Sequence, residues 1–358
     1  MASFYCPTKV YTGPDSLQTL AQYHARRVLV VTDAFFSQNG TAQEIAAWAN
    51  AEQVRIFDRV KPDPEAALAV EGAAMCVRFS PDLLIALGGG SAMDCAKAIM
   101  LTAGASVRFI AIPTTSGSGS EMTSFSILTH GNVKHPLVDP ALRPEAAILH
   151  ESLLQQLPRQ LIADTGFDLL AHCIEALTAT GRSAFTDALA LHAAATVVEN
   201  LQASYCGDIG VRLSIHEAAS MAGLAFDQAG LGVCHALAHA LGGAFHVAHG
   251  RLCAMLLPHV MKFNAAKALG QYVCLARRLA LPTAAEGLAL RKLIGAVSAL
   301  ARQLHMPADL GQAGVTPEQW RMQKTAVLDA AMDDPCCRTN PVPVTRNALE
   351  QLCKAVEP

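Results

Sequence analysis

The sequence predicts an α/β domain over residues 1–157 followed by an all-α domain over residues 158–358. Short aliphatic runs alternate with helical patterns in the first part, which is typical of a parallel sheet with crossover helices. After Ile148–Leu149 nearly every segment has a helical pattern. A chain of 358 residues is also long enough for two domains, each with its own core.

The expected strands of the first domain are rich in β-branched and aliphatic residues, and they cover residues 27–33, 54–57, 82–87 and 108–112. Between the first two, residues 41–51 have a helical pattern, with Thr41 as the expected cap and Glu44 three residues further on. In the second domain, glycines and prolines are expected to separate the helices. These breaks are Pro158, Gly207, Gly232, Gly242–Gly243, Pro282, Pro307 and the stretch from Pro335 to Pro343.

Composition and net charge argue against nucleic acid and membrane as binding partners. The formal net charge is −3, which provides no basic face for nucleic acid or for an anionic membrane surface. Hydrophobic residues make up 52% of the chain and charged residues 16%, a balance that disfavours disorder. We therefore expect a small-molecule partner, with no nucleic acid and no membrane.

The cysteines and the N-terminal segment indicate a cytoplasmic protein. Eleven cysteines, an odd number with no C-x-x-C pair, fit neither a disulfide framework nor a thiolate zinc site. The first residues lack the basic and apolar segments of a signal peptide. Residues 228–250 contain no charged side chain and could span a bilayer by length, but their four histidines and five glycines fit a buried site better than a lipid environment.

Two glycine-rich turns follow neighbouring strands. The strand at 82–87 leads into Gly88-Gly89-Gly90-Ser91, where glycines allow a pyrophosphate to approach the backbone and the start of a helix favours an anion. A polar turn at 113–121 follows the strand at 108–112. Either turn alone could be a tight turn or a solvated loop. Together, at the carboxyl ends of strands, they favour a nucleotide cofactor.

Asp33 ends the first of the predicted strands. A carboxylate there can accept hydrogen bonds from an adenosine ribose and repels a 2′-phosphate, which favours NAD over NADP. The alternative role is to cap a helix or turn.

An aspartate and several histidines suggest a metal site. Asp168 and His172 are four residues apart on a helical segment and so share one face, as do His235 and His239. A single such pair would fit a surface contact, and a lone histidine would fit a core position. Three imidazoles and one carboxylate would form a four-coordinate Zn²⁺ or Fe²⁺ site with room for a substrate oxygen. Spacing leaves five candidate histidines, namely His172, His235, His239, His246 and His249.

Taken together, these motifs resemble those of the iron-containing (group III) alcohol dehydrogenases over essentially the whole chain. The resemblance is carried by residues 88–94, 113–121, 163–176 and 234–250. It implies a dehydroquinate-synthase-like fold, with an N-terminal NAD-binding domain, a C-terminal helical domain and the metal between them. Residues 338–341 and the exact residues of these motifs are most similar to those of microcompartment-associated 1-propanol and ethanol dehydrogenases.

Carried over position by position, the resemblance implies that Asp168, His172, His235 and His249 hold the metal, Fe²⁺ or Zn²⁺. His239 falls where the family has a histidine beside the nicotinamide and substrate, which implies a catalytic role. The positions that match the family's cofactor-binding residues are Asp33, Gly89, Gly90, Ser91, Asp94, Thr114, Thr115, Ser118 and Lys134.

The implied function is an NAD- and metal-dependent alcohol dehydrogenase, or aldehyde reductase, acting on short-chain primary alcohols and aldehydes of the propanal/1-propanol or acetaldehyde/ethanol type. Three alternatives stay open: a glycerol-type polyol dehydrogenase, a metal-free relative of the maleylacetate reductase kind, and a non-enzymatic NAD-binding or microcompartment scaffold. We also expect a homodimer or higher homo-oligomer. Its location would be the cytoplasm or a bacterial microcompartment, where shell or enzyme partners could bind it.

Overall fold

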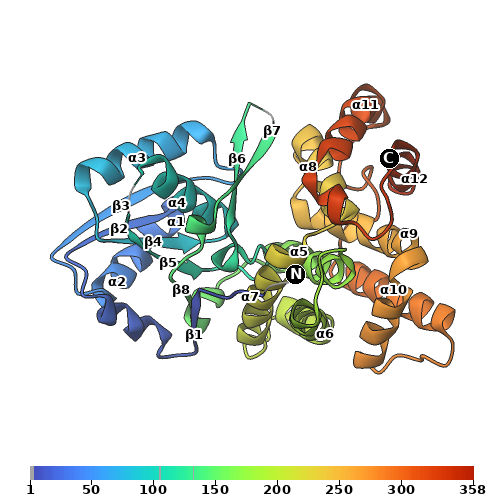
Figure 1. Cartoon of the computed structure of the whole chain (residues 1–358), viewed down its shortest axis with the longest axis horizontal. Coiled ribbons are helices and arrows are strands. Elements are labelled where there is room, and N and C mark those ends of the chain that lie inside the picture. The colour runs from blue at the N-terminus through green and yellow to red at the C-terminus, as the bar shows by residue number, and fades with distance from the viewer. Residues whose placement is uncertain (1–3, 105, 132) are drawn as a thin grey trace. The chain divides into compact units, whose positions relative to one another are not determined.

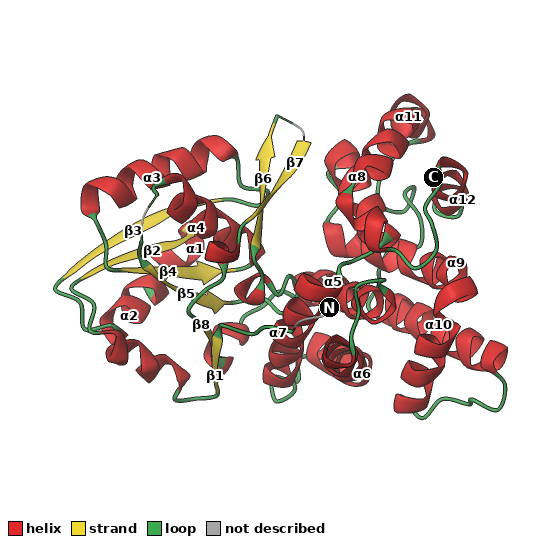
Figure 2. Cartoon of the chain, viewed as in Figure 1, coloured by secondary structure: helices red, strands yellow, loops and turns green. Residues whose placement is uncertain are grey.

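The computed structural model describes residues 4–104, 106–131 and 133–358. The chain divides into two compact units (Figure 1), one of which is Tyr5–Leu157. The other is Pro158–Pro358 together with the N-terminal segment that ends at Phe4, whose ring stacks on Phe185 with centroids 5.1 Å apart. All described strands belong to the first unit (Figure 2). No helix in the described part of the chain is long and apolar enough to cross a membrane.

A six-stranded sheet with the order β1-β8-β5-β4-β2-β3 forms the centre of the first unit, and every pairing in it is parallel. Its central strand β4 is buried at every residue, because helices cover both faces of the sheet. The strands are β1 (Lys9–Thr12), β2 (Arg27–Asp33), β3 (Gln53–Val60), β4 (Leu83–Gly88), β5 (Arg108–Pro113) and β8 (Ala146–Leu149).

The two faces of this sheet bury alternate residues of each strand. On one face, Val28 and Val30 of β2 pack with the 3₁₀ helix η1 (Ser16–Tyr23) and with α2 (Thr41–Trp48). On the other, Leu29 and Val31 pack with α3 (Ala66–Phe79) and α4 (Gly90–Thr102), as Figure 1 shows for the helices. The short helix α1 (Ala34–Gln38) follows β2 directly.

Each of the four expected strands is present, whereas three local details differ from the prediction. Helix α2 is capped by Gly40, at φ +87°, rather than by Thr41, which is its first residue. Two further strands of the sheet, β1 at its edge and its neighbour β8, were not expected. Nor was the antiparallel hairpin formed by β6 (Phe125–His130) and β7 (Val133–Val138).

The second unit is helical, as expected, and its helices begin or end near the predicted breaks at Pro158, Gly207 and Gly232. The predicted break at Gly242–Gly243 is wrong, because α8 continues to Phe245 and ends at His246, which has φ +56°. The helices are α5 (Arg159–Thr178), α6 (Ala184–Cys206), α7 (Arg212–Ala229), α8 (Val233–Phe245), α9 (His249–Arg278), α10 (Glu286–Gln303), α11 (Pro317–Asp333) and α12 (Arg346–Lys354).

Helices α5 and α9 approach closely at a glycine. A Cβ atom on Gly250 would lie 1.7 Å from the carbonyl oxygen of Asp164, so only glycine fits there. Beside this contact, Arg251 Nε donates to Asp164 Oδ1 at 3.0 Å. The crossing brings His249, the first residue of α9, next to Asp168 of α5.

We predict that Gly250→Ala destabilises the protein by about 1–3 kcal/mol or more, the usual cost of overpacking, because the new methyl group must push α9 away from α5. Chemical denaturation measures the change. Gly270→Ala, in the same helix with open space around it, is the control and should be neutral or stabilise by up to about 1 kcal/mol. Equal midpoints for Gly250→Ala and the unsubstituted chain would contradict the close contact.

Candidate metal centre

One carboxylate oxygen of Asp168 lies among three imidazoles. Asp168 Oδ1 is 3.6 Å from His172 Nδ1, 3.6 Å from His235 Nε2 and 3.4 Å from His249 Nε2. The residues come from α5, α8 and the first turn of α9. The structure thus brings together the four residues that the resemblance implied as metal ligands.

These separations are longer than hydrogen bonds and suit atoms that share an ion. Metal–nitrogen and metal–oxygen bonds of about 2.1 Å at a tetrahedral angle place two ligand atoms about 3.4 Å apart. Asp168 Oδ1 and His235 Nε2 are also buried without a hydrogen-bond partner among the described residues. Since unpaired buried polar atoms are costly, a cation between them would account for the arrangement.

The electrostatics of the cluster favour positive charge. Burial raises the pKa of Asp168, but the nearby imidazoles of His172, His235 and His249 lower it well below its usual range. Burial lowers the pKa of His235, but its contacts with Asp168 and Glu175 raise it to about 10. A divalent cation and a proton would therefore compete for the same nitrogen.

Glu175, which the sequence analysis missed, contacts one of these imidazoles. Its side chain is buried, and Glu175 Oε2 accepts a hydrogen bond from His235 Nδ1 at 2.6 Å. Glu175 lies two turns after Asp168 on the same face of α5. That spacing is the signal that could have pointed to it.

Cys253 is a further donor that the sequence analysis did not select. One donor atom from each of Asp168, His235, His249 and Cys253 lies within 4.8 Å of the others. Cys253 lies one turn after His249 in α9, so the sequence spacing places both residues on one face of a helix. The sequence has no C-x-x-C pair that would have suggested Cys253 as a metal ligand. His172 is outside this group of four and stacks on His235, with ring centroids 4.4 Å apart.

His239, the predicted catalytic residue, lies at the edge of the cluster. Its ring stacks on that of His249, with centroids 5.2 Å apart. Its Nδ1 is 2.8 Å from Asp334 Oδ2, another contact that the sequence analysis missed. Burial raises the pKa of Asp334, but its hydrogen bond with His239 lowers it below the usual value. His239, Asp334 and Cys336 form a second group of possible metal donors.

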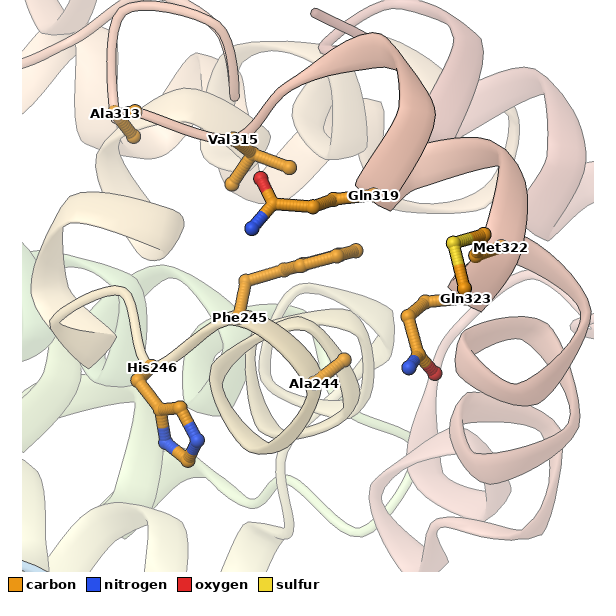
Figure 3. Close-up of a pocket in the computed structure, with 9 residues that line it drawn as sticks. Ala244, Phe245, His246, Ala313, Val315, Gln319, Met322 and Gln323 are labelled. Atoms are coloured by element: carbon orange, nitrogen blue, oxygen red, sulfur yellow. The ribbon is translucent and has the colours of Figure 1, made fainter.

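His246 is exposed and lies apart from the metal donors. It lines a pocket of about 270 Å³ at the end of α8, together with Phe245 and with Gln319 and Gln323 of α11. Figure 3 shows the imidazole pointing away from both glutamines. None of the residues that line this pocket belongs to either donor group, so we do not assign substrate binding to it.

The two glycine-rich turns of the first unit lie side by side, because β4 and β5 are neighbours in the sheet. A Cβ atom on Gly89 would be 3.1 Å from Thr115 Oγ1, and one on Gly90 would be 2.9 Å from Ser118 Oγ. Gly89 caps α4, and Gly90 is its first residue. The backbone at this helix start is therefore closely approached by the second turn.

Most of the remaining predicted cofactor residues lie in or beside these turns. Asp33 Oδ1 accepts hydrogen bonds from the backbone N–H groups of Phe35 and Phe36, so the predicted alternative of a helix cap is present. Asp94 Oδ1 accepts from Ser120 Oγ at 3.0 Å. The others are Ser91 in the first turn of α4, buried Thr114 after β5, and Lys134 in β7, whose side chain lies outside the described residues.

Comparison with known proteins identifies the family. Residues 7–151 match the profile of "Iron-containing alcohol dehydrogenase", and residues 162–356 match "Fe-containing alcohol dehydrogenase family, C-terminal". The chain belongs to the iron-containing alcohol dehydrogenase family. The predicted family and its dehydroquinate-synthase-like fold, an α/β domain followed by an all-α domain, are thereby confirmed.

Several family members are similar over almost their full length. The chain is 36% identical to 1-propanol dehydrogenase PduQ of Citrobacter freundii, covering 98% of this chain and 99% of that protein. It is 31% identical to the NADPH-dependent butanol dehydrogenase of Clostridium saccharobutylicum, covering 99% and 98%. The iron-containing alcohol dehydrogenase structure from Thermococcus thioreducens aligns with a TM-score of 0.91 and 32% identity over 99% of each chain.

We predict that Asp168→Ala weakens Zn²⁺ or Co²⁺ binding by more than the roughly tenfold to hundredfold typical of residues that only contact a ligand, because it removes a ligand itself. Equilibrium dialysis with metal analysis measures the affinity. Asp334→Asn, in the second donor group, is the control and should leave the affinity unchanged. If Asp334→Asn weakened metal binding and Asp168→Ala did not, the ion would bind at His239 and Asp334 instead.

Proposed function

We propose that this protein is a metal- and NAD-dependent alcohol dehydrogenase, or aldehyde reductase, of short-chain primary alcohols and aldehydes. The observation that carries the proposal is the single carboxylate oxygen of Asp168, which lies within 3.6 Å of a nitrogen of each of three imidazoles. In this proposal residues 158–358 hold the metal, through Asp168, His172, His235 and His249. Residues 1–157 bind the dinucleotide.

The donor set suits a divalent cation that is Fe²⁺, as the family name indicates, or Zn²⁺, which binds nitrogen and oxygen donors more tightly. A metal bound there supplies Lewis-acid polarisation of the substrate oxygen, and the nicotinamide accepts or donates the hydride. Burial raises the pKa of Cys253 well above its usual value and so disfavours the thiolate that binds metals, and we therefore do not assign Cys253 as a ligand.

His239 is proposed to move the proton of the reaction. Because its Nδ1 is held by Asp334, its Nε2 is the nitrogen available to exchange a proton with the substrate oxygen or with water. Its side chain is 21% exposed, against 1% for His235, so His239 is the imidazole of this pair that solvent can reach. Proton transfer and metal binding are thus assigned to different histidines of α8.

The two glycine-rich turns are proposed to hold the cofactor. Gly89, Gly90 and Ser91 at the start of α4 present backbone N–H groups suited to the pyrophosphate. Around them, Asp94, Thr114, Thr115, Ser118 and Lys134 are proposed to bind the rest of the dinucleotide. Asp33 is proposed to face the adenosine ribose through Oδ2, since Oδ1 caps α1.

The substrate class rests on the relatives, which include a 1-propanol dehydrogenase and a butanol dehydrogenase. We propose propanal and 1-propanol, or acetaldehyde and ethanol, as substrate pairs. A homo-oligomer and a location in the cytoplasm or in a bacterial microcompartment belong to the same proposal. A glycerol-type polyol dehydrogenase is the alternative within this fold.

An assay of anaerobically purified protein loaded with Fe²⁺ tests the function. We predict that NADH is oxidised with propanal and butanal at a higher kcat/KM than NAD⁺ is reduced with glycerol, and that chelation of the metal abolishes both reactions. Preference for glycerol would favour the polyol alternative. No turnover of any of these substrates by metal-loaded protein would favour a non-enzymatic role.

We predict that Asp33→Asn lowers the preference for NADH over NADPH by about tenfold or more, because it removes the charge that repels a 2′-phosphate. Asparagine caps helices as well as aspartate does, so α1 should remain intact. The ratio of kcat/KM for the two cofactors measures the effect. An unchanged ratio would mean that Asp33 acts only as a helix cap. A higher kcat/KM with NADPH than with NADH in the unsubstituted chain would contradict the NAD assignment.

A further inference from the structure

We infer that Glu175 is a positioning residue that holds His235 in the orientation and protonation pattern that metal binding requires. The inference rests on the proposed metal site. Glu175 is 2% exposed, comes from α5, and reaches the first turn of α8. It therefore links the helix that carries Asp168 to the helix that carries His235.

The contact with the imidazole determines which nitrogen faces the metal site. His235 Nδ1 lies 2.6 Å from Glu175 Oε2, a length typical of hydrogen bonds to a charged group. Since a carboxylate only accepts hydrogen bonds, Nδ1 must carry a proton. In the neutral ring Nε2 is then unprotonated, and this is the atom that lies 3.6 Å from Asp168 Oδ1. Glu175 thus selects the tautomer that presents a lone pair to the cation.

The same carboxylate fixes the backbone that carries the ring. Glu175 Oε1 accepts a hydrogen bond from Cys234 N at 2.7 Å, and Oε2 accepts from Gly232 N at 3.0 Å and His235 N at 3.3 Å. These N–H groups belong to the first turn of α8 and its cap, where a helix has no internal acceptors. The negative charge also suits the positive end of the helix dipole. His235 is held at both its backbone and its ring.

Gly232 allows this approach. A Cβ atom at this position would lie 2.6 Å from Glu175 Oε1 and 2.7 Å from Asn340 Oδ1. Glycine leaves room for two polar side chains to reach the start of α8 at once. The predicted helix break at Gly232 therefore also lets the carboxylate reach His235.

Asn340 provides a test of whether Glu175 acts only as a helix cap. Asn340 Oδ1 accepts a hydrogen bond from Val233 N at 3.1 Å, in the same turn of α8. Its side chain also exchanges hydrogen bonds with Asn264 and donates to the carbonyl oxygen of Val342, and among the described residues no hydrogen bond joins it to His235. Loss of Asn340 removes part of the cap while the imidazole keeps its hydrogen bond to Glu175.

The experiment compares Glu175→Gln with Asn340→Ala in the full-length chain. Zn²⁺ affinity is measured by competition with a chromophoric chelator, and stability by thermal unfolding of the metal-free protein. We expect both variants to unfold at lower temperature. Only Glu175→Gln should also weaken Zn²⁺ binding, by about tenfold to a hundredfold.

An unchanged Zn²⁺ affinity in folded Glu175→Gln would overturn the inference and leave Glu175 as a cap. Equal losses of affinity in both variants would do the same, since the loss would then follow helix stability. Failure of the unsubstituted chain to bind Zn²⁺ would instead refute the proposed metal site. If Glu175→Gln does not fold, a crystal structure of the Zn²⁺-loaded unsubstituted protein decides. Coordination through His235 Nε2 supports the inference, and coordination through Nδ1 overturns it.

Discussion

The carboxylate oxygen Oδ1 of Asp168, which is shielded from solvent, is the constraint on which the helical unit depends. A charged group removed from water must find compensating charge, and Asp168 Oδ1 finds it in imidazoles rather than in hydrogen bonds. Three helix segments must therefore converge on one oxygen atom. The glycines follow from that requirement: Gly250 lets α9 touch the backbone of α5, and Gly232 lets a second carboxylate reach the start of α8. The first approach places His249 beside Asp168, and the second lets Glu175 hold His235, whose other nitrogen faces Asp168.

The features that the sequence predicted are those set by neighbouring residues, namely pairs of residues at helical spacing and glycine-rich turns. The pair Asp168 and His172 and the pair His235 and His239 show the helical period directly, and the glycines after β4 mark a turn whatever the tertiary structure. Such patterns predicted the fold class and the four strands. The hairpin of β6 and β7 and the edge strand β1 have no comparably strong pattern. The break expected at Gly242–Gly243 did not occur, since glycine weakens a helix by only about 1 kcal/mol and packing can outweigh that cost.

The residues that the sequence analysis missed are those whose role comes from a distant partner. Glu175 is 60 residues from His235 along the chain, and Asp334 is 95 residues from His239. A glutamate on an apolar helix face shows that something must neutralise it, but not which helix supplies the partner. Asp33 illustrates the reverse case. Both of its predicted roles fit one side chain, because a carboxylate has two oxygens and the cap uses only Oδ1.

Helix α8 shows how one arrangement can support two kinds of chemistry. His235 and His239 are one turn apart, and each has its Nδ1 bonded to a carboxylate, from Glu175 and from Asp334. The rings therefore present the same nitrogen, Nε2, away from their carboxylates. They differ in surroundings: His235 is sealed beside Asp168, whereas His239 stacks on the outer imidazole of His249 and is partly exposed. A sealed imidazole cannot exchange its proton with water, so it suits a fixed ligand. An exposed one can, so it suits proton transfer. Burial, more than residue type, separates the two proposed roles.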